Sequence, residues 1–187
     1  MTILKNIFAL GAVLVASASI ASATPITGSV GITGAFDSIL MSGGTVTGIS
    51  FAGSIADQIV AGTDSLTSFT GAGVSLTGFD FDSSADGTTF YTSTVGGETL
   101  TFVIDTLTPG SLSATNGSVS GTGEFFLTGY TPTAATWSLG YSSSGIDTFA
   151  ASSTAIAATP EPNSLMLLGT GLVGAAGMLF RRRSVNV

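Results

Sequence analysis

Between residues 24 and 159, apolar and polar positions alternate in short runs that glycine, proline, asparagine and aspartate interrupt. Such alternation predicts half-buried strands, and short strands at close spacing are typical of all-β domains. No helical period is sustained, although Ile55–Val60 is compatible with one helical turn. We therefore predict an all-β domain over residues 24–159, with about eight to ten antiparallel strands in a sandwich or jelly-roll-like arrangement.

A small β-solenoid is the alternative fold, because turns rich in glycine and threonine also suit stacked coils. Similar segments begin at Thr33, Thr77 and Thr128, but their separations are unequal. A solenoid requires a fixed period, so these segments are interpreted as similar strand starts.

The clearest predicted hairpin spans Thr88 to Asp105 and turns at Gly96-Gly97. A Gly-Gly pair adopts the positive φ angles that a two-residue hairpin turn needs. In its second strand Leu100, Phe102 and Ile104 share one face. A second turn is predicted at Asn116-Gly117.

Aromatic residues fall on single faces of two further predicted strands. Phe79 and Phe81 alternate with Asp80 and Asp82, which places rings on one face and carboxylates on the other. Trp137, Leu139 and Tyr141 also share a face, and Thr131-Pro132-Thr133 predicts a turn before them.

The N-terminal residues have the pattern of a secretory signal peptide over 1–23. Lys5 precedes an apolar run from Ile7 to Ala16, and Ala21-Ser22-Ala23 fits the small-residue cleavage rule. Cleavage after Ala23 leaves Thr24 as the first residue of an exported chain.

The C-terminal residues predict a single transmembrane helix. Leu165–Phe180 is apolar or small, and at about 1.5 Å per residue it spans about 24 Å, slightly short of a hydrocarbon core of about 30 Å. Arg181, Arg182 and Arg183 follow immediately and predict a cytoplasmic C-terminus, with the β domain outside the inner membrane.

Residues 160–187 resemble the PEP-CTERM sorting signal. The resemblance is carried by Pro160-Glu161-Pro162, Ser164, the start of the helix at Leu165, its glycines, and the terminal arginine cluster. It implies a protein of exopolysaccharide-producing Gram-negative bacteria that exosortase, a membrane transpeptidase-like enzyme, processes near Pro-Glu-Pro. An ordinary tail anchor is the alternative for this segment.

Composition excludes several function classes. The four basic residues lie at the two ends, so the middle of the chain carries acids alone and cannot bind nucleic acid through phosphates. Cysteine and histidine are absent, which excludes disulfides, Cys/His zinc sites and Cys or His nucleophiles. No cofactor is predicted.

Asp80, Asp82 and Asp86 form the densest acid cluster and are a weak candidate for a calcium site. Their spacing departs from the EF-hand loop. We favour a solvent-facing strand edge followed by an Asp-Gly turn, and hence no metal.

Catalysis is not expected. Glu98 and Glu124 are the only glutamates between residues 24 and 159, and a glycosidase needs two carboxylates close together in a cleft. Tyr130, Trp137 and Tyr141 could stack on sugar rings if exposed, but such rings more often fill a core.

The sequence therefore predicts an exported surface or matrix protein with a structural or interaction role. Exosortase is its expected partner, with the inner membrane before processing; exopolysaccharide at the surface is a further candidate partner. A carbohydrate- or calcium-binding surface module is the alternative, and burial of Trp137 and Tyr141 would favour the structural interpretation.

Overall fold

The computed structural model describes residues 24–51, 57–143 and 148–156, together with residue 171. The chain divides into two compact units, Met1–Ile156 and Ala157–Val187. All described strands belong to the first unit, and the second is described only at Gly171, which is helical.

The described part of the first unit consists of strands and two short 3-10 helices. The 3-10 helices are η1 (Asp64–Phe69) and η2 (Ser83–Ala85). The strands are β1 Ser29–Ala35, β2 Ser38–Ser42, β3 Thr45–Ser50, β4 Gln58–Gly62, β5 Ser75–Leu76, β6 Phe79–Asp80, β7 Thr89–Val95, β8 Glu98–Leu112, β9 Asn116–Leu127, β10 Thr133–Ser142 and β11 Thr148–Ala155.

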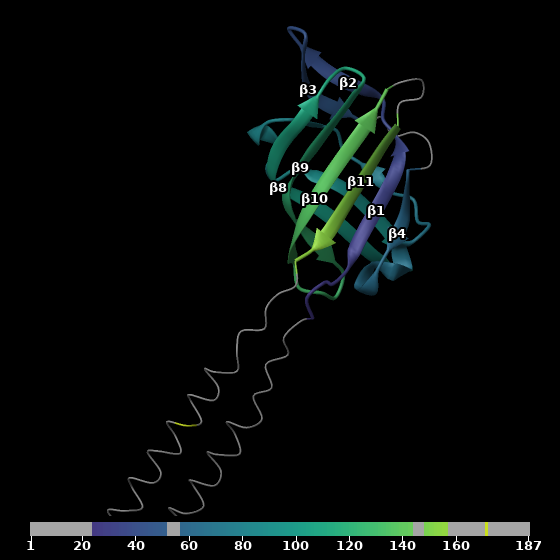
Figure 1. Ribbon diagram of the computed structural model, residues 1–187. Helices are drawn as coiled ribbons and strands as arrows, with labels where there is room; N and C mark the ends of the chain where they lie inside the picture. The colour runs from purple at the N-terminus through teal and green to yellow at the C-terminus, as the bar shows by residue number, and fades with distance from the viewer. Residues whose placement is uncertain (1–23, 52–56, 144–147, 157–170, 172–187) are drawn as a thin grey trace, which may run out of the picture. The chain divides into compact units, whose positions relative to one another are not determined.

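Eight of these strands form one antiparallel sheet in the order β4-β1-β11-β10-β9-β8-β7-β5 (Figure 1). Strands β7 to β11 are neighbours both in sequence and in space. Strand β1 lies between β4 and β11, so Ser29 pairs with Thr154 near the other end of the unit. The sheet thus combines a run of consecutive hairpins with one long-range pairing.

The large sheet curls until its two edge regions meet. The segment that leads into β5 runs beside β4, where the Ile59 amide donates to the Ala72 carbonyl at 3.0 Å. The Val74 amide donates to the Asp57 carbonyl, also at 3.0 Å. These bonds satisfy backbone groups that an open edge would leave unpaired.

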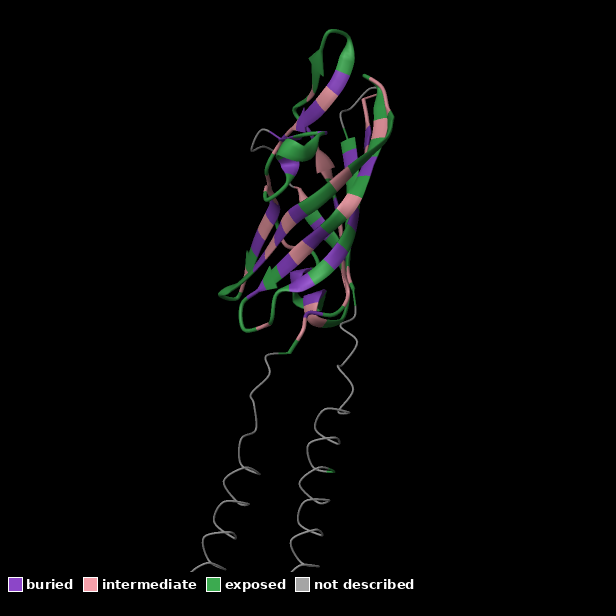
Figure 2. Cartoon of the chain, turned by 90° about the vertical axis from the view of Figure 1, so that its left-hand side faces the viewer, coloured by how far each residue is buried: buried purple, intermediate pink, exposed green. Residues whose placement is uncertain are grey.

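Alternate side chains of the curled sheet face a common interior, which Figure 2 shows as buried and exposed positions alternating along the strands. On β8, Leu100, Phe102 and Ile104 are fully buried. On β10, Trp137 and Tyr141 are almost as deeply buried. Burial of each such side chain contributes roughly 1.5–3 kcal/mol, so these faces hold the sheet together.

Three inward positions of β9 are glycines, and aromatic rings from neighbouring strands fill the space above them. A Cβ at Gly117 would lie 2.7 Å from Cε1 of Tyr141, and one at Gly123 would lie 2.8 Å from Cε1 of Phe102. A Cβ at Gly121 would lie 3.0 Å from Nε1 of Trp137. The glycines therefore let large rings pack directly on the β9 backbone.

A small sheet, β2-β3-β6, packs against the interior of the large one. The Phe79 ring of β6 meets Phe90 and Trp137 edge-on, with centroids 5.3 and 5.9 Å away. The β2–β3 hairpin turns at Gly43-Gly44, whose φ angles are +59° and +84°, and projects at one end of the unit (Figures 1 and 2).

The antiparallel all-β prediction is confirmed. The predicted Gly96-Gly97 turn is also confirmed, because Val95 pairs with Glu98 and the two glycines have φ angles of +60° and +90°. The strand order differs from a jelly roll, since consecutive hairpins form most of one curled sheet. The antiparallel pairing also differs from a solenoid.

Three local features differ from the prediction: one predicted helical turn is part of a strand, and two turns lie at neighbouring positions. Residues 58–60 of the possible helical turn belong to β4, because Ile59 pairs with the segment before β5; residues 55 and 56 lie outside the described residues. The second turn precedes Gly117, since the Ser113 hydroxyl accepts the Asn116 amide at 3.0 Å. The third lies at Gly129 (φ +86°), where the Tyr130 amide bonds to the Leu127 carbonyl.

Candidate functional site

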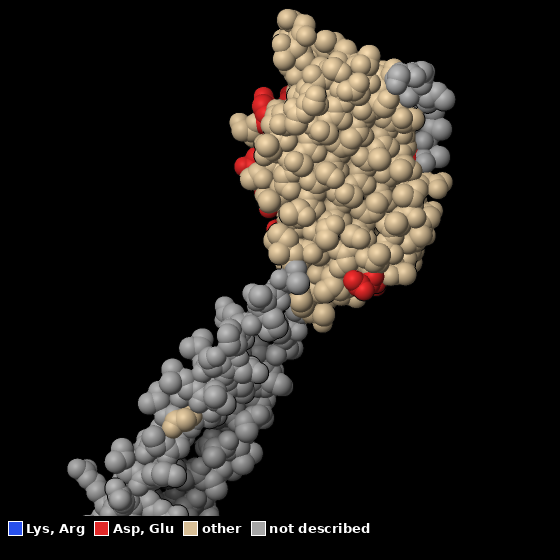
Figure 3. All heavy atoms as spheres, in the orientation of Figure 1, with Lys and Arg blue, Asp and Glu red and all other residues tan. Residues whose placement is uncertain are grey.

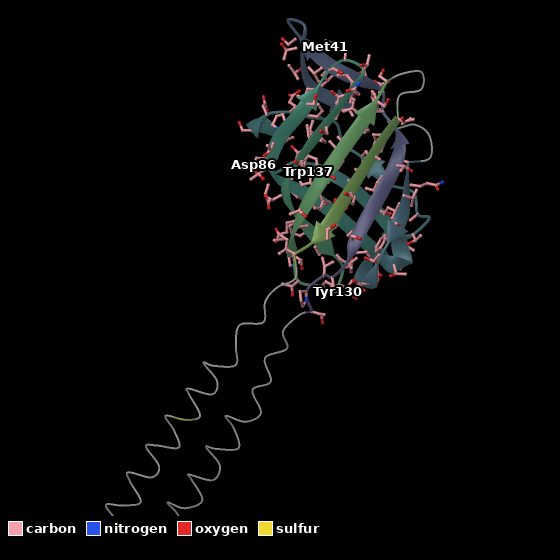
Figure 4. The ribbon with its side chains drawn as sticks, viewed as in Figure 1. Met41, Asp86, Tyr130 and Trp137 are labelled. Atoms are coloured by element: carbon pink, nitrogen blue, oxygen red, sulfur yellow. The ribbon has the colours of Figure 1, made fainter. Side chains whose placement is uncertain are left out.

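The three aspartates of the candidate calcium cluster lie at the end of β6 and on either side of η2. Asp82 precedes η2, and its Oδ1 accepts the Ser84 amide at 2.7 Å. Hydrogen bonding from the Ser84 hydroxyl, and then from this amide, holds the pKa of Asp82 below its usual value. Asp80 is exposed at the end of β6, and Asp86 ends η2 before Gly87, where φ is +77° (Figure 4). Among the described residues, no group of three or more acids could hold a metal ion.

The aromatic residues considered for sugar stacking lie mainly inside the sheet. Trp137 is 3% exposed and Tyr141 is 4% exposed. The Tyr141 hydroxyl donates to the Ser113 carbonyl at 2.9 Å, and burial raises the pKa of this phenol. Tyr130 is partly buried and packs against the core away from Trp137, as Figure 4 shows. Neither Trp137 nor Tyr141 offers an open ring face to a sugar.

Glu98 and Glu124 do not form a carboxylate pair. Glu98 begins β8, whereas Glu124 on β9 pairs with Val103, five residues further along β8. At about 3.4 Å per residue this separates the two backbones by about 17 Å, beyond the spacing that glycosidases use. Strand alternation also assigns the two residues to opposite faces.

One hollow of about 500 Å³ lies near the ends of β8, β9, β10 and β11. Its polar lining includes Ser111, Asn116, Ser118 and Thr148, and none of the described residues that line it is Asp, Glu, Lys or Arg. Such a lining can hydrogen-bond a neutral polar molecule but supplies no acid–base pair. The hollow was not predicted from the sequence; the available signal was Gly140, where an added Cβ would meet only the Gly117 carbonyl oxygen, at 4.0 Å.

All charged side chains of the described unit are acidic. All four basic residues lie outside the described residues, so the acids there have no Lys or Arg partner within that part of the chain. Figure 3 shows the visible acids near the margins of the unit, while the broad face over β10, β11 and β1 carries no charged side chain in this view. The exposed positions of β10 and β11 are instead mainly serine, threonine and alanine.

Outside this unit, residues 158–183 match the family model of the PEP-CTERM protein-sorting motif. The chain carries a PEP-CTERM sorting motif. The match includes Pro160-Glu161-Pro162 and the arginines at 181–183, so the resemblance seen in the sequence is confirmed. No curated protein and no solved structure matches the chain.

The PEP-CTERM motif implies an exported protein that exosortase processes, with a membrane-anchored precursor. The sorting residues Pro160, Glu161, Pro162, Arg181, Arg182 and Arg183 all lie outside the described residues, as do Ala21 and Ala23 of the predicted signal cleavage site. Within the described part of the chain, no helix has the length and apolar character needed to cross a membrane. Of the predicted span 165–180, only Gly171 is described.

Proposed function

We propose that the chain is a surface or matrix protein of an exopolysaccharide-producing Gram-negative bacterium, with a structural or interaction role and no catalytic one. The observation that carries the proposal is the PEP-CTERM motif at residues 158–183, which begins three residues after β11 ends at Ala155. The β unit is therefore the segment that the motif delivers.

The chemistry of the β unit supports an interaction role. Asp82 caps a 3-10 helix, the Trp137 ring fills the core, and Glu98 lies far from Glu124 along the sheet. The residues considered for catalysis or metal binding thus either stabilise the fold or, like the two glutamates, lie too far apart to act together. The outward positions of β10 and β11 are small and uncharged, as a packing surface requires.

The tail provides recognition and retention in this proposal. Proline disfavours helix and biases the residue before it towards extended backbone, so the sequence at Pro160 and Pro162 suits binding in a protease-like cleft. Each arginine at 181–183 costs about 2.5–3.5 kcal/mol to place at the centre of a membrane helix, so the cluster stops the chain from sliding outward.

Acidic polysaccharide is a weak partner in this proposal. Between residues 24 and 159 the chain carries acids and no lysine or arginine. Like charges repel over about 8 Å at physiological salt, so divalent cations must bridge the two polyanions. Association should then disappear when a chelator is added.

Replacing Pro160-Glu161-Pro162 with three alanines tests the sorting role. We expect the variant to lose its signal peptide but to remain at full C-terminal length in the inner membrane. The intact mass of the protein from each cell fraction is the measurement. A double variant of the flanking residues, Thr159→Ala with Asn163→Ala, is the matched control. Normal trimming and surface delivery of the triple-alanine variant would show that Pro-Glu-Pro is only a stem.

Neutral saccharide binding is the second candidate function, and the hollow near Ser118 and Thr148, whose described lining residues carry no charge, favours it. We expect Ala150→Trp, which fills the hollow, to abolish binding of neutral oligosaccharides in calorimetric titration. Thr154→Trp, further along β11 and outside the hollow's lining, should retain it. Equal binding by both variants would assign the binding to another surface.

A further inference from the structure

The outer edge of β2 is an open sheet edge within the described part of the chain. β2 ends the three-stranded sheet, and no described strand pairs with the edge that faces away from β3. It belongs to the hairpin that projects at one end of the unit, where Figure 4 labels Met41. An edge strand presents a row of unpaired amides and carbonyls, which is a template for another strand.

This edge lacks the devices that normally prevent strand addition. β2 has the sequence Ser-Ile-Leu-Met-Ser, with neither charge nor proline, and its Leu40 and Met41 side chains are 37% and 51% exposed. The irregularity in the β2–β3 ladder places the extra residue, Thr47, on β3, because Leu40 pairs with Gly48 and Met41 with Val46. β2 itself therefore stays regular and able to pair.

The sequence of β2 is complementary to itself in antiparallel order. If Leu40 of one chain faces Leu40 of a second, Ser38 faces Ser42 and Ile39 faces Met41. Polar positions then meet polar positions and apolar meet apolar, in a two-fold arrangement where each chain uses the same surface. Cross-strand apolar pairs of this kind are what stabilise antiparallel ladders.

The distribution of charge also favours a second copy of this chain as the partner of β2, and an antiparallel orientation of the two β2 strands. The described unit carries acids without lysine or arginine, so contacts between copies through the acidic margins repel, whereas β2 is neutral. In the antiparallel register Asp37 faces Gly43 of the other chain, and the two Asp37 residues lie about 20 Å apart along the strands, beyond the screening length. A parallel pairing would place them side by side.

We propose that β2 of one chain adds antiparallel to β2 of a second chain, which joins the two small sheets into one sheet of order β6-β3-β2-β2-β3-β6. The contact is short, so association in solution is weak and rises with concentration. It uses the end of the unit opposite to Ile156, where the chain leaves β11 (Figure 1). The pairing is independent of exosortase processing.

The absence of cysteine allows a direct test with the full chain in detergent micelles. Leu40→Cys places two thiols opposite each other across the two-fold axis, at a separation of about 4.5–5.5 Å between Cβ atoms, and mild oxidation should give a disulfide-linked dimer. Val60→Cys is the control, because Val60 on β4 is 53% exposed but lies on no β2 edge. Equal cross-linking of the two variants overturns the proposal.

Charge exchange at the same position gives a second test. We expect Leu40→Lys to weaken self-association roughly tenfold in sedimentation measurements, since two like charges then face each other. Leu40→Glu should have the same effect, and an equimolar mixture of the two variants should restore dimers. Val60→Lys should leave association unchanged. Self-association that persists in Leu40→Lys, or a mixture that stays monomeric, contradicts β2 pairing.

Discussion

The indole of Trp137 donates its N–H to the main-chain carbonyl of Thr122 on the neighbouring strand, with 3.1 Å between Nε1 and the oxygen. The carbonyl of Thr106, one strand further, lies 3.3 Å from the same nitrogen. Gly121 leaves open the space that the indole occupies. One side chain thus links β8, β9 and β10 from inside the sheet and satisfies its own polar group there.

Adding a methyl group at Gly121 should destabilise the fold. A Cβ there would contact the Thr106 carbonyl and lie 3.0 Å from Trp137 Nε1. We expect Gly121→Ala to lower the free energy of unfolding by about 1–3 kcal/mol, the usual cost of overpacking. Urea unfolding followed by fluorescence of Trp137, the single tryptophan, is the measurement.

Gly140→Ala is the matched control on β10. Its Cβ would have only the Gly117 carbonyl oxygen within reach, at 4.0 Å, so the free energy of unfolding should change by less than about 0.5 kcal/mol. Equal losses at Gly121 and Gly140 would contradict the packing argument.

Trp137 should behave as a buried fluorophore. Because the side chain is 3% exposed, its emission should be blue-shifted and protected from acrylamide until urea unfolds the chain. Trp137→Ala should destabilise by about 3–5 kcal/mol, and Trp137→Phe by less. Strong quenching of the folded chain, or an emission change on adding sugars, would show an accessible ring.

The Asp82 cap should make stability depend on acid pH. Hydrogen bonds from the Ser84 hydroxyl and from the Ser84 amide lower the pKa of this carboxyl in the folded state. Its stabilising effect is therefore complete above the unfolded pKa of about 3.9 and is lost as the pH falls through the folded value. Asp82→Ala should be less stable than the parent at pH 7, with the gap closing in acid.

Asp82→Asn is the control for the cap, because its amide oxygen still accepts the Ser84 N–H. It should keep most of the stability at pH 7 and lose the acid dependence. A pH dependence unchanged by either substitution would assign the acid effect to other carboxyls.

Asp57 should affect the pH dependence of the free energy of unfolding in the opposite direction to Asp82. Burial raises the pKa of this carboxyl, although the Ala35 amide, which donates to Oδ1 at 3.1 Å, opposes the rise. A raised folded pKa favours the protonated form, so its contribution is present below the unfolded pKa and is lost as the pH rises through the folded value. Asp57→Asn should therefore increase the free energy of unfolding at pH 7.

The control for Asp57 is Asp57→Ala, which removes the acceptor for the Ala35 amide and should lower stability at all pH values. The measurement is urea unfolding between pH 3 and pH 7. A loss of stability in Asp57→Asn at pH 7 would mean that the charge itself is needed.

Local chemistry made much of the fold predictable from sequence. Gly96-Gly97 determines its hairpin through backbone freedom, and the alternation at Leu100 and Phe102 marks the buried face without any tertiary information. The turn at Asn116-Gly117 was misplaced because the Ser113 hydroxyl organises the preceding residues. A side chain that bonds to its own turn competes with a glycine signal nearby.

Long-range features were not predictable in the same way. Nothing in the sequence of β1 specifies β11 as its neighbour, and the meeting of β4 with the segment before β5 depends on how far the sheet curls. The candidate site shows the same limit. Trp137 has the side chain of a sugar platform, and only the neighbouring Gly121 explains why it lies inside.

The pairing of Ser29 with Thr154 sets the order of events during export. Contacts between residues so far apart in sequence form late, after the closure entropy of the intervening chain has been overcome. A chain that crosses the membrane from its N-terminus holds β1 without its β11 partner until the last strand emerges. Resistance to protease should therefore arise in one step, only after Ala155 has been translocated, and the sorting motif follows almost at once.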